Sequence, residues 1–151
     1  INCKEVERIE SWVEEAVEQG AKVGLGGKRE GSVFTPTVLL NVTNDMAVSC
    51  QETFAPVVSI VPYSELDEAI NMVNDSVYGL NVAIYTQNIM NALNAAKKLE
   101  SGGVIINDIP TFRLDHMPYG GVKESGYGRE GIKYAVEEMT ELKFVTIKTS
   151  F

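Results

Sequence analysis

Hydrophobic residues recur every three or four positions in four stretches of the chain, and this spacing predicts four amphipathic helices. In the first stretch, Asn2 is placed to cap the helix with Glu5 reaching back in a capping-box arrangement, and Gly20 provides the stop. The apolar face of this helix is formed by Val6, Ile9, Val13, Ala16 and Val17.

The other three helices show the same periodicity. They are expected over residues 66–73, 89–99 and 132–139. Ser64 is placed to cap the first of these, and the pair Gly102 and Gly103 ends the second.

Five short runs rich in β-branched and aromatic residues lie between or after these helices and predict strands. They cover residues 37–42, 57–61, 81–85, 104–106 and 142–147. The second and fourth runs are expected to be buried, whereas the glycines between positions 24 and 31 predict a turn. Because strands alternate with helices, the pattern predicts parallel βαβ units and an α/β fold.

The composition narrows the class of partner. The chain has 151 residues and a formal net charge of −8, which argues against nucleic acid because phosphates need a basic surface. The longest apolar stretch, residues 54–63, is too short to cross a membrane. Cys3 and Cys50 form neither a disulfide framework nor a metal-binding spacing, and nothing resembles a signal peptide. We therefore expect a cytoplasmic protein with no metal, membrane or nucleic-acid partner.

The first residue is Ile rather than Met, and a helix is predicted almost immediately after it. This indicates a piece of a longer protein. N-terminal processing and absent disordered residues are the alternatives.

Residues 126–131 match the pattern G-x-G-x-x-G, which in dinucleotide-binding proteins holds a pyrophosphate on backbone amides. Here no strand directly precedes the motif, and no acidic residue ends a second strand about 20 residues later. The context favours a structural turn.

A thiol nucleophile is a further candidate, because Cys50 lies close to the acidic Glu52. The single histidine, His116, is distant in sequence, and Cys3 also lacks a partner. Inert cysteines and a hydrogen-bonded loop histidine are the favoured interpretations.

Two longer strings carry a family resemblance. Residues 51–57, Q-E-T-F-A-P-V, resemble the E-x-F-G-P-V segment of the aldehyde dehydrogenase superfamily, and residues 118–131 resemble its P-F-G-G-x-K-x-S-G-x-G-R-E-G segment. Shorter matches lie between and around these two strings, in the family's order, at residues 20–23, 36–38, 74–75, 78–80, 106–107 and 139–143. The resemblance covers essentially the whole chain. It also implies that the glycine motif is a structural turn and that the dinucleotide fold lies upstream.

The resemblance implies a three-layer, parallel-sheet α/β domain and the NAD- or NADP-dependent oxidation of an aldehyde to an acid. In this family a cysteine thiolate attacks the carbonyl, hydride passes to the nicotinamide, and a glutamate-activated water hydrolyses the thioester. The catalytic cysteine and glutamate would both lie upstream of Ile1, so no catalytic residue is expected in this chain. Residues 1–141 would be the C-terminal part of the catalytic domain. Residues 142–151 would form a strand and tail through which the protein homo-oligomerises.

Carried over by position, Glu52 falls where the family's glutamate binds the nicotinamide ribose hydroxyls, and Phe54 falls where an aromatic ring packs beside the nicotinamide. A carboxylate suits the first task because it accepts hydrogen bonds from two vicinal hydroxyls. Ala55 departs from the family's usual glycine, which bears on the local backbone angle.

Tyr119 falls where the family has an aromatic residue lining the substrate tunnel, and the region around it resembles members that act on lactaldehyde, glyceraldehyde phosphate or similar short polar aldehydes. Arg113 is expected either to bind a polar or anionic tail of the aldehyde or to pair with Asp108 or Asp115 at the surface.

Two other functions are weighed against a fragment of such an enzyme. One is a free-standing, non-catalytic α/β binding or assembly module derived from the family, which keeps the terminal strand. The other, a flavodoxin-like nucleotide binder, is disfavoured because no phosphate loop follows a first strand.

Overall fold

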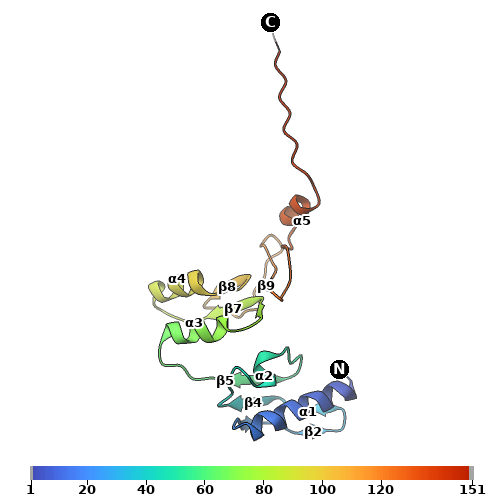
Figure 1. Cartoon of the computed structure of the whole chain (residues 1–151), viewed down its shortest axis with the longest axis vertical. Coiled ribbons are helices and arrows are strands. Elements are labelled where there is room, and N and C mark those ends of the chain that lie inside the picture. Colours follow the sequence, from blue (N-terminus) through green and yellow to red (C-terminus); the bar gives the residue numbers. More distant parts are fainter. Residues whose placement is uncertain (1, 150–151) are drawn as a thin grey trace. The chain divides into compact units, whose positions relative to one another are not determined.

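The computed structural model describes residues 2–149, which form two compact units that divide between Ser76 and Val77. Figure 1 shows the first unit in blue to green and the second in yellow to red. Among the described residues, no helix is long and apolar enough to cross a membrane.

The first unit begins with α1 (Cys3–Glu18), which confirms the first predicted helix. The Asn2 side chain accepts a hydrogen bond from the Glu5 amide at 3.0 Å, as the capping pattern predicts. The Glu5 carboxylate pairs instead with Arg8 Nε at 2.8 Å, so only the Asn2 half of the expected capping box is formed. Gly20 follows the helix with a φ of 112°, which suits glycine.

A three-stranded sheet lies at the centre of this unit, in the order β1-β4-β5. The predicted strands β4 (Thr37–Leu40) and β5 (Val57–Ile60) pair in parallel, whereas β1 (Lys22–Leu25) pairs antiparallel with β4. The glycines in this region predict a turn, and the strand β1 corrects that expectation. Pairing with β4 outweighs the low strand propensity of its glycine, which is a tertiary effect.

A two-residue connection through Gly31, at a φ of 64°, joins the short strands β2 (Arg29–Glu30) and β3 (Val33–Phe34) into a hairpin. The core of the unit consists of the apolar face of α1 together with Phe34, Leu39 and Val42. In β5, Val58 and Ile60 are exposed and Val57 and Ser59 are only partly buried, so this strand is not buried on both faces as expected.

The helices α2 (Ala47–Cys50) and α3 (Leu66–Asn74) complete the first unit. The predicted cap of α3 is corrected by one residue. Glu65, rather than Ser64, is the N-cap, and it forms a reciprocal capping box with Glu68.

The second unit contains the predicted βαβ arrangement. Strand β7 (Asn81–Ile84) pairs in parallel with β8 (Gly103–Ile106), and α4 (Ile89–Lys98) connects them. Helix α4 ends at Lys98, before the expected glycine stop, and buries Ala92 and Ala95. Two parallel pairs with intervening helices confirm the α/β class, and antiparallel pairs make the sheets mixed.

The short strands β6 (Tyr78–Gly79) and β9 (Val122–Lys123) pair antiparallel, and α5 (Ile132–Glu138) follows the glycine motif. Residues 140–149 form no strand. The strand expected at 142–147 therefore finds no pairing partner in the described part of the chain, and its role in assembly stays a prediction.

Candidate functional site

The candidate cofactor-binding residues lie in the first unit, in a segment between α2 and β5 that we call the cofactor segment (residues 52–54). Phe54 is 70% exposed and has a φ of 42°, a left-handed conformation that is uncommon outside glycine. Glu52 is also exposed, and no hydrogen bond of its carboxylate is found within residues 2–149. An acceptor-only carboxylate and an exposed ring, two positions apart, suit a ribose and a nicotinamide ring.

The cofactor segment is held from both sides. Downstream, the Pro56 carbonyl accepts a hydrogen bond from the Thr37 amide at 2.8 Å, which anchors the start of β5 to β4. From α1, Arg8 Nη2 donates to the Thr53 carbonyl at 2.9 Å. Beside Phe54 lies a cleft of about 270 Å³, which residues of α1 and the β2–β3 hairpin also line.

The candidate substrate residues lie in the second unit, at a cleft of about 420 Å³. Arg113 and Tyr119 both line it, and the Arg113 guanidinium lies over the Tyr119 ring at 4.2 Å from its centroid. The structure thus brings together the two residues that are expected to contact the substrate. Such cation–π contact fixes the plane of the guanidinium.

The acidic partner of Arg113 is Glu130, not Asp108 or Asp115 as the surface alternative expected. Arg113 Nη2 lies 2.9 Å from Glu130 Oε2, and Asp108 instead caps the Ile109 amide. The Glu130 backbone also exchanges two hydrogen bonds with Tyr119, of 2.6 and 3.1 Å. Sequence reasoning missed Glu130 because it belongs to the glycine motif and is 17 residues from Arg113.

Two asparagines hold the loop that carries Arg113, and sequence reasoning gave neither a role. Asn107, at a φ of 60°, bonds through its side-chain amide to both the amide and the carbonyl of Thr86. Asn81 Nδ2 donates to the Pro110 carbonyl at 2.9 Å. Both asparagines belong to the parallel β7–β8 pair or follow it directly, and their position next to strands was the available signal.

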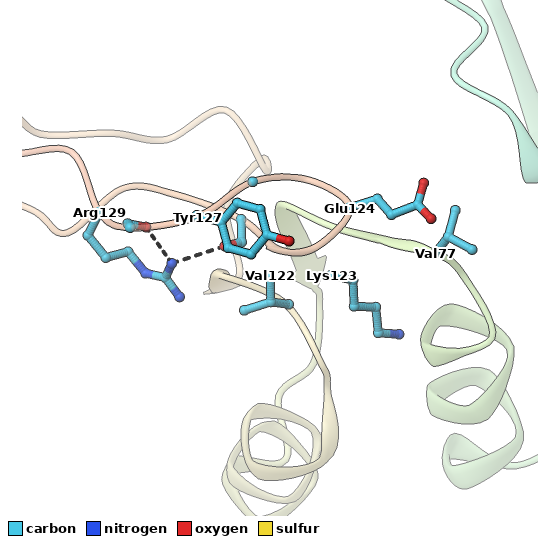
Figure 2. A pocket seen from close by; sticks show the side chains of 9 residues that line it. Val77, Val122, Lys123, Glu124, Tyr127 and Arg129 are labelled. Atoms are coloured by element: carbon cyan, nitrogen blue, oxygen red, sulfur yellow. Dashed lines mark hydrogen bonds between the residues drawn. The ribbon is translucent and has the colours of Figure 1, made fainter.

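The glycine motif is a structural turn. Its three glycines all have positive φ, a backbone conformation that other residues rarely adopt. Glu138 accepts from the Arg129 amide, and Arg129 Nη1 donates to the carbonyls of Gly121 and Gly128. Figure 2 shows the two bonds of Arg129 Nη1 beside an open hollow that Tyr127 borders. This network joins the turn to the helix that follows it and to the loop before it, which favours a structural turn.

The remaining candidates show no catalytic geometry. Cys50 Sγ donates to the Asp45 carbonyl at 3.7 Å, and Cys3 and His116 are exposed. The Thr43 hydroxyl hydrogen-bonds the Asp45 carboxylate and lowers the pKa of that group below its ordinary value. Within residues 2–149, no group of three His, Cys, Asp or Glu side chains is placed to hold a metal ion.

Comparison with known proteins places these residues in a family. A profile of the aldehyde dehydrogenase family matches residues 1–145. The chain is 54% identical over 147 residues to the 3-sulfolactaldehyde dehydrogenase of Priestia aryabhattai, covering 97% of this chain and 31% of that protein. It is 48% identical over 147 residues to the lactaldehyde dehydrogenase of Methanocaldococcus jannaschii, again covering 97% and 31%. The chain therefore spans about a third of the length of these relatives.

Solved structures agree with the sequence comparison. The crystal structure of glyceraldehyde-3-phosphate dehydrogenase from Methanocaldococcus jannaschii, complexed with NADP, matches 94% of this chain and 31% of its own, with a TM-score of 0.87 and 48% identity. An aldehyde dehydrogenase from Physcomitrella patens, in complex with succinate, matches 93% and 29%, with a TM-score of 0.88 and 42% identity. Motifs, fold and comparisons agree, and the chain belongs to the aldehyde dehydrogenase family.

Proposed function

We propose that this chain is the C-terminal part of the catalytic domain of an NAD(P)-dependent aldehyde dehydrogenase that oxidises a short polar aldehyde with an anionic tail. The observation that carries this proposal is the Arg113 guanidinium, which lines a cleft and is stacked on Tyr119. The names of two of the similar proteins support the anionic tail, because sulfolactaldehyde and glyceraldehyde 3-phosphate are short aldehydes that end in a sulfonate or a phosphate. Lactaldehyde, after which another similar protein is named, is also short and polar but carries no anionic group.

Arg113 is suited to such a tail by the donors it keeps. Its Nη2 bonds to Glu130, and no partner of Nε or Nη1 is found among residues 2–149, so part of the fork is left for a ligand. A planar fork binds a phosphate, sulfonate or carboxylate through two parallel hydrogen bonds, which an ammonium group does not. Glu130 prevents the arginine from folding away, and Tyr119 holds its plane.

The cofactor segment would hold the nicotinamide end of NAD or NADP. Glu52 would accept hydrogen bonds from the ribose hydroxyls, and Phe54 would cover one face of the ring. When bound, the cofactor supplies the hydride acceptor for aldehyde oxidation. The catalytic thiolate, which would form the thioester, and the glutamate that activates water would come from residues outside this chain.

We also propose that the whole protein is a homo-oligomer that pairs through residues 142–147 and works in the cytoplasm. The exposed apolar side chains of the tail support the first point. The unpaired cysteines fit the reducing conditions of the cytoplasm.

The proposal is tested with Arg113→Ala in the full-length enzyme, assayed on glyceraldehyde 3-phosphate and on the neutral propionaldehyde. We expect kcat/KM for the anionic aldehyde to fall about ten- to hundredfold, mainly because KM rises. This corresponds to a loss of about 1.5–3 kcal/mol of transition-state stabilisation. Propionaldehyde kinetics should be nearly unchanged because this substrate has no charged tail. Arg113→Lys serves as the control that keeps the charge but loses the fork. Equal losses on both aldehydes would show that Arg113 only stabilises its loop.

A further inference from the structure

The cofactor segment has few internal constraints. No backbone amide or carbonyl of residues 52–54 takes part in a backbone–backbone hydrogen bond within residues 2–149. Phe54 nevertheless keeps a left-handed φ of 42°, and the following residue is Ala55 rather than a glycine. A non-glycine residue in this region persists only where the surrounding structure holds it. Some contact from outside the segment must therefore supply the restraint.

Arg8 on α1 supplies this contact. Its Nη2 donates to the Thr53 carbonyl at 2.9 Å, across 45 positions of sequence, and Thr53 lies between Glu52 and Phe54. Within residues 2–149, this is the only hydrogen bond found for residues 52–54. The carbonyl just before the left-handed residue is thereby fixed.

Arg8 is itself fixed on two sides. Glu5 accepts its Nε–H at 2.8 Å one helical turn earlier, and the Trp12 ring lies under its guanidinium at 4.2 Å, one turn later. Residues three and four positions apart share a helix face, so α1 presents Glu5, Arg8 and Trp12 as one stripe. The guanidinium uses its Nε, its Nη2 and its flat face at once, which a lysine ammonium cannot reproduce.

We propose that Arg8 is a positioning residue that holds the cofactor segment in the conformation that places Glu52 and Phe54 against the nicotinamide end of the cofactor. The inference rests on the proposed function of Glu52 and Phe54. Arg8 acts through the Thr53 carbonyl and contacts neither the cofactor nor the substrate. Losing it would leave Glu52 and Phe54 chemically intact but mobile.

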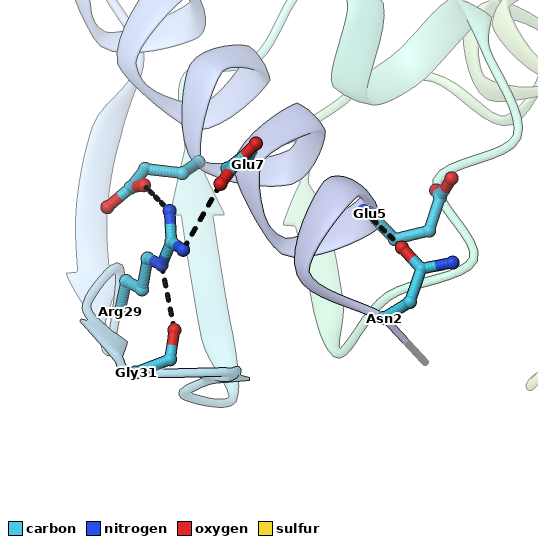
Figure 3. A network of polar contacts seen from close by, with 6 residues as sticks. Asn2, Glu5, Glu7, Arg29 and Gly31 are labelled. Atoms are coloured by element: carbon cyan, nitrogen blue, oxygen red, sulfur yellow. Dashed lines mark hydrogen bonds and ion pairs between the residues drawn. The ribbon is translucent and has the colours of Figure 1, made fainter.

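The first test follows the segment itself by ¹⁵N relaxation in the chain truncated after residue 141, which lacks the apolar residues expected to cause self-association. We expect Arg8→Met to lower the backbone order parameters of residues 52–54 from roughly 0.85 toward below about 0.6. Arg29→Met is the matched control. Figure 3 shows Arg29 bonded to Glu7 of the same helix and to the Gly31 carbonyl, and within residues 2–149 no hydrogen bond of Arg29 to residues 52–54 is found. Arg29→Met should leave these order parameters unchanged.

Arg8→Lys keeps the charge and most of the packing. If Arg8→Met unfolds α1, Arg8→Lys still tests whether the guanidinium restrains residues 52–54. We expect a smaller loss of order, confined to residues 52–54. Order parameters equal to those of the wild-type chain in Arg8→Lys and Arg8→Met, or an equal loss in Arg29→Met, would overturn the proposal.

The second test uses the full-length enzyme and separates this inference from the function on which it rests. Arg8→Met should weaken NADPH or NADH binding, followed by nucleotide fluorescence, and slow single-turnover hydride transfer about tenfold, with the KM for aldehyde little changed. Normal values in Arg8→Met alongside slow transfer in Glu52→Gln would overturn the positioning role. Normal values in Glu52→Gln would instead refute the proposed function of the segment, and the order parameters would still decide whether Arg8 restrains it.

Discussion

At the scale of single residues, the main feature of Glu52 is a carboxylate that is left available to a ligand. It is exposed, and within residues 2–149 neither oxygen has a hydrogen-bond partner, although the backbone next to it is anchored by Arg8. A free carboxylate on a restrained backbone suits a bidentate contact with two hydroxyls, because little order is lost when it binds.

We therefore predict that Glu52→Gln in the full-length enzyme slows hydride transfer about ten- to hundredfold. A charge-assisted hydrogen bond contributes about 1.5–3 kcal/mol, and glutamine keeps the size but loses the charge. Single-turnover absorbance of the reduced cofactor measures this step. Glu30→Gln, in the β2–β3 hairpin, is the control and should leave the rate unchanged. An unaltered rate in Glu52→Gln would remove Glu52 from the cofactor site.

At the scale of secondary-structure elements, α3 shows how a helix start is decided by geometry as well as residue type. Ser64 is the better N-cap by statistics, yet the helix begins one residue later and uses Glu65. Glu68 Oε2 reaches back to the Ser64 amide at 2.8 Å and the Glu65 amide at 3.4 Å, so one side chain satisfies two donors.

We predict that Glu65→Ala lowers the free energy of unfolding by about 0.5–2 kcal/mol, the usual contribution of a helix cap. Ser64→Ala should be nearly neutral because the Ser64 hydroxyl does not cap the helix. Urea denaturation followed by circular dichroism compares the two. A larger loss in Ser64→Ala than in Glu65→Ala would show that the helix starts one residue earlier.

At the scale of the whole molecule, the chain contains candidate binding residues but no candidate nucleophile beside a base among its described residues. We predict that the 151-residue chain alone forms no NADH or NADPH from lactaldehyde. Without the covalent step, positioning and electrostatic effects have no reaction to accelerate. Absorbance at the reduced-nicotinamide band measures this. Activity that depends on Cys3 or Cys50, or that survives the loss of both, would contradict the prediction.

Residues 142–147, near the C-terminus, also concern the whole molecule. Their apolar side chains are all exposed, namely Leu142, Phe144, Val145 and Ile147. An unpaired apolar segment of this kind favours addition to another strand. We predict that the chain self-associates at micromolar concentration in size-exclusion chromatography with light scattering, and that truncation after residue 141 reduces the association. A sharp monomer peak for the untruncated chain would count against it.

Local patterns in the sequence determined much of the fold. The heptad-like spacing of Val6, Ile9 and Val13 specifies α1, since burial of one helical face depends only on positions close in sequence. The same holds for the β7-α4-β8 unit and hence for the α/β class. The motifs at 51–57 and 118–131 also identified the family, because they are long and occur in order.

Only the tertiary structure decided which distant groups meet. The pairing of β1 with β4, the bond from Arg8 to Thr53 and the pair of Arg113 with Glu130 each join residues far apart in sequence. Such contacts depend on how loops fold back on the strands, and no local spacing encodes that path. Residues 142–147 show the converse case. Their sequence has strand propensity, but a strand forms only where a partner supplies its hydrogen bonds.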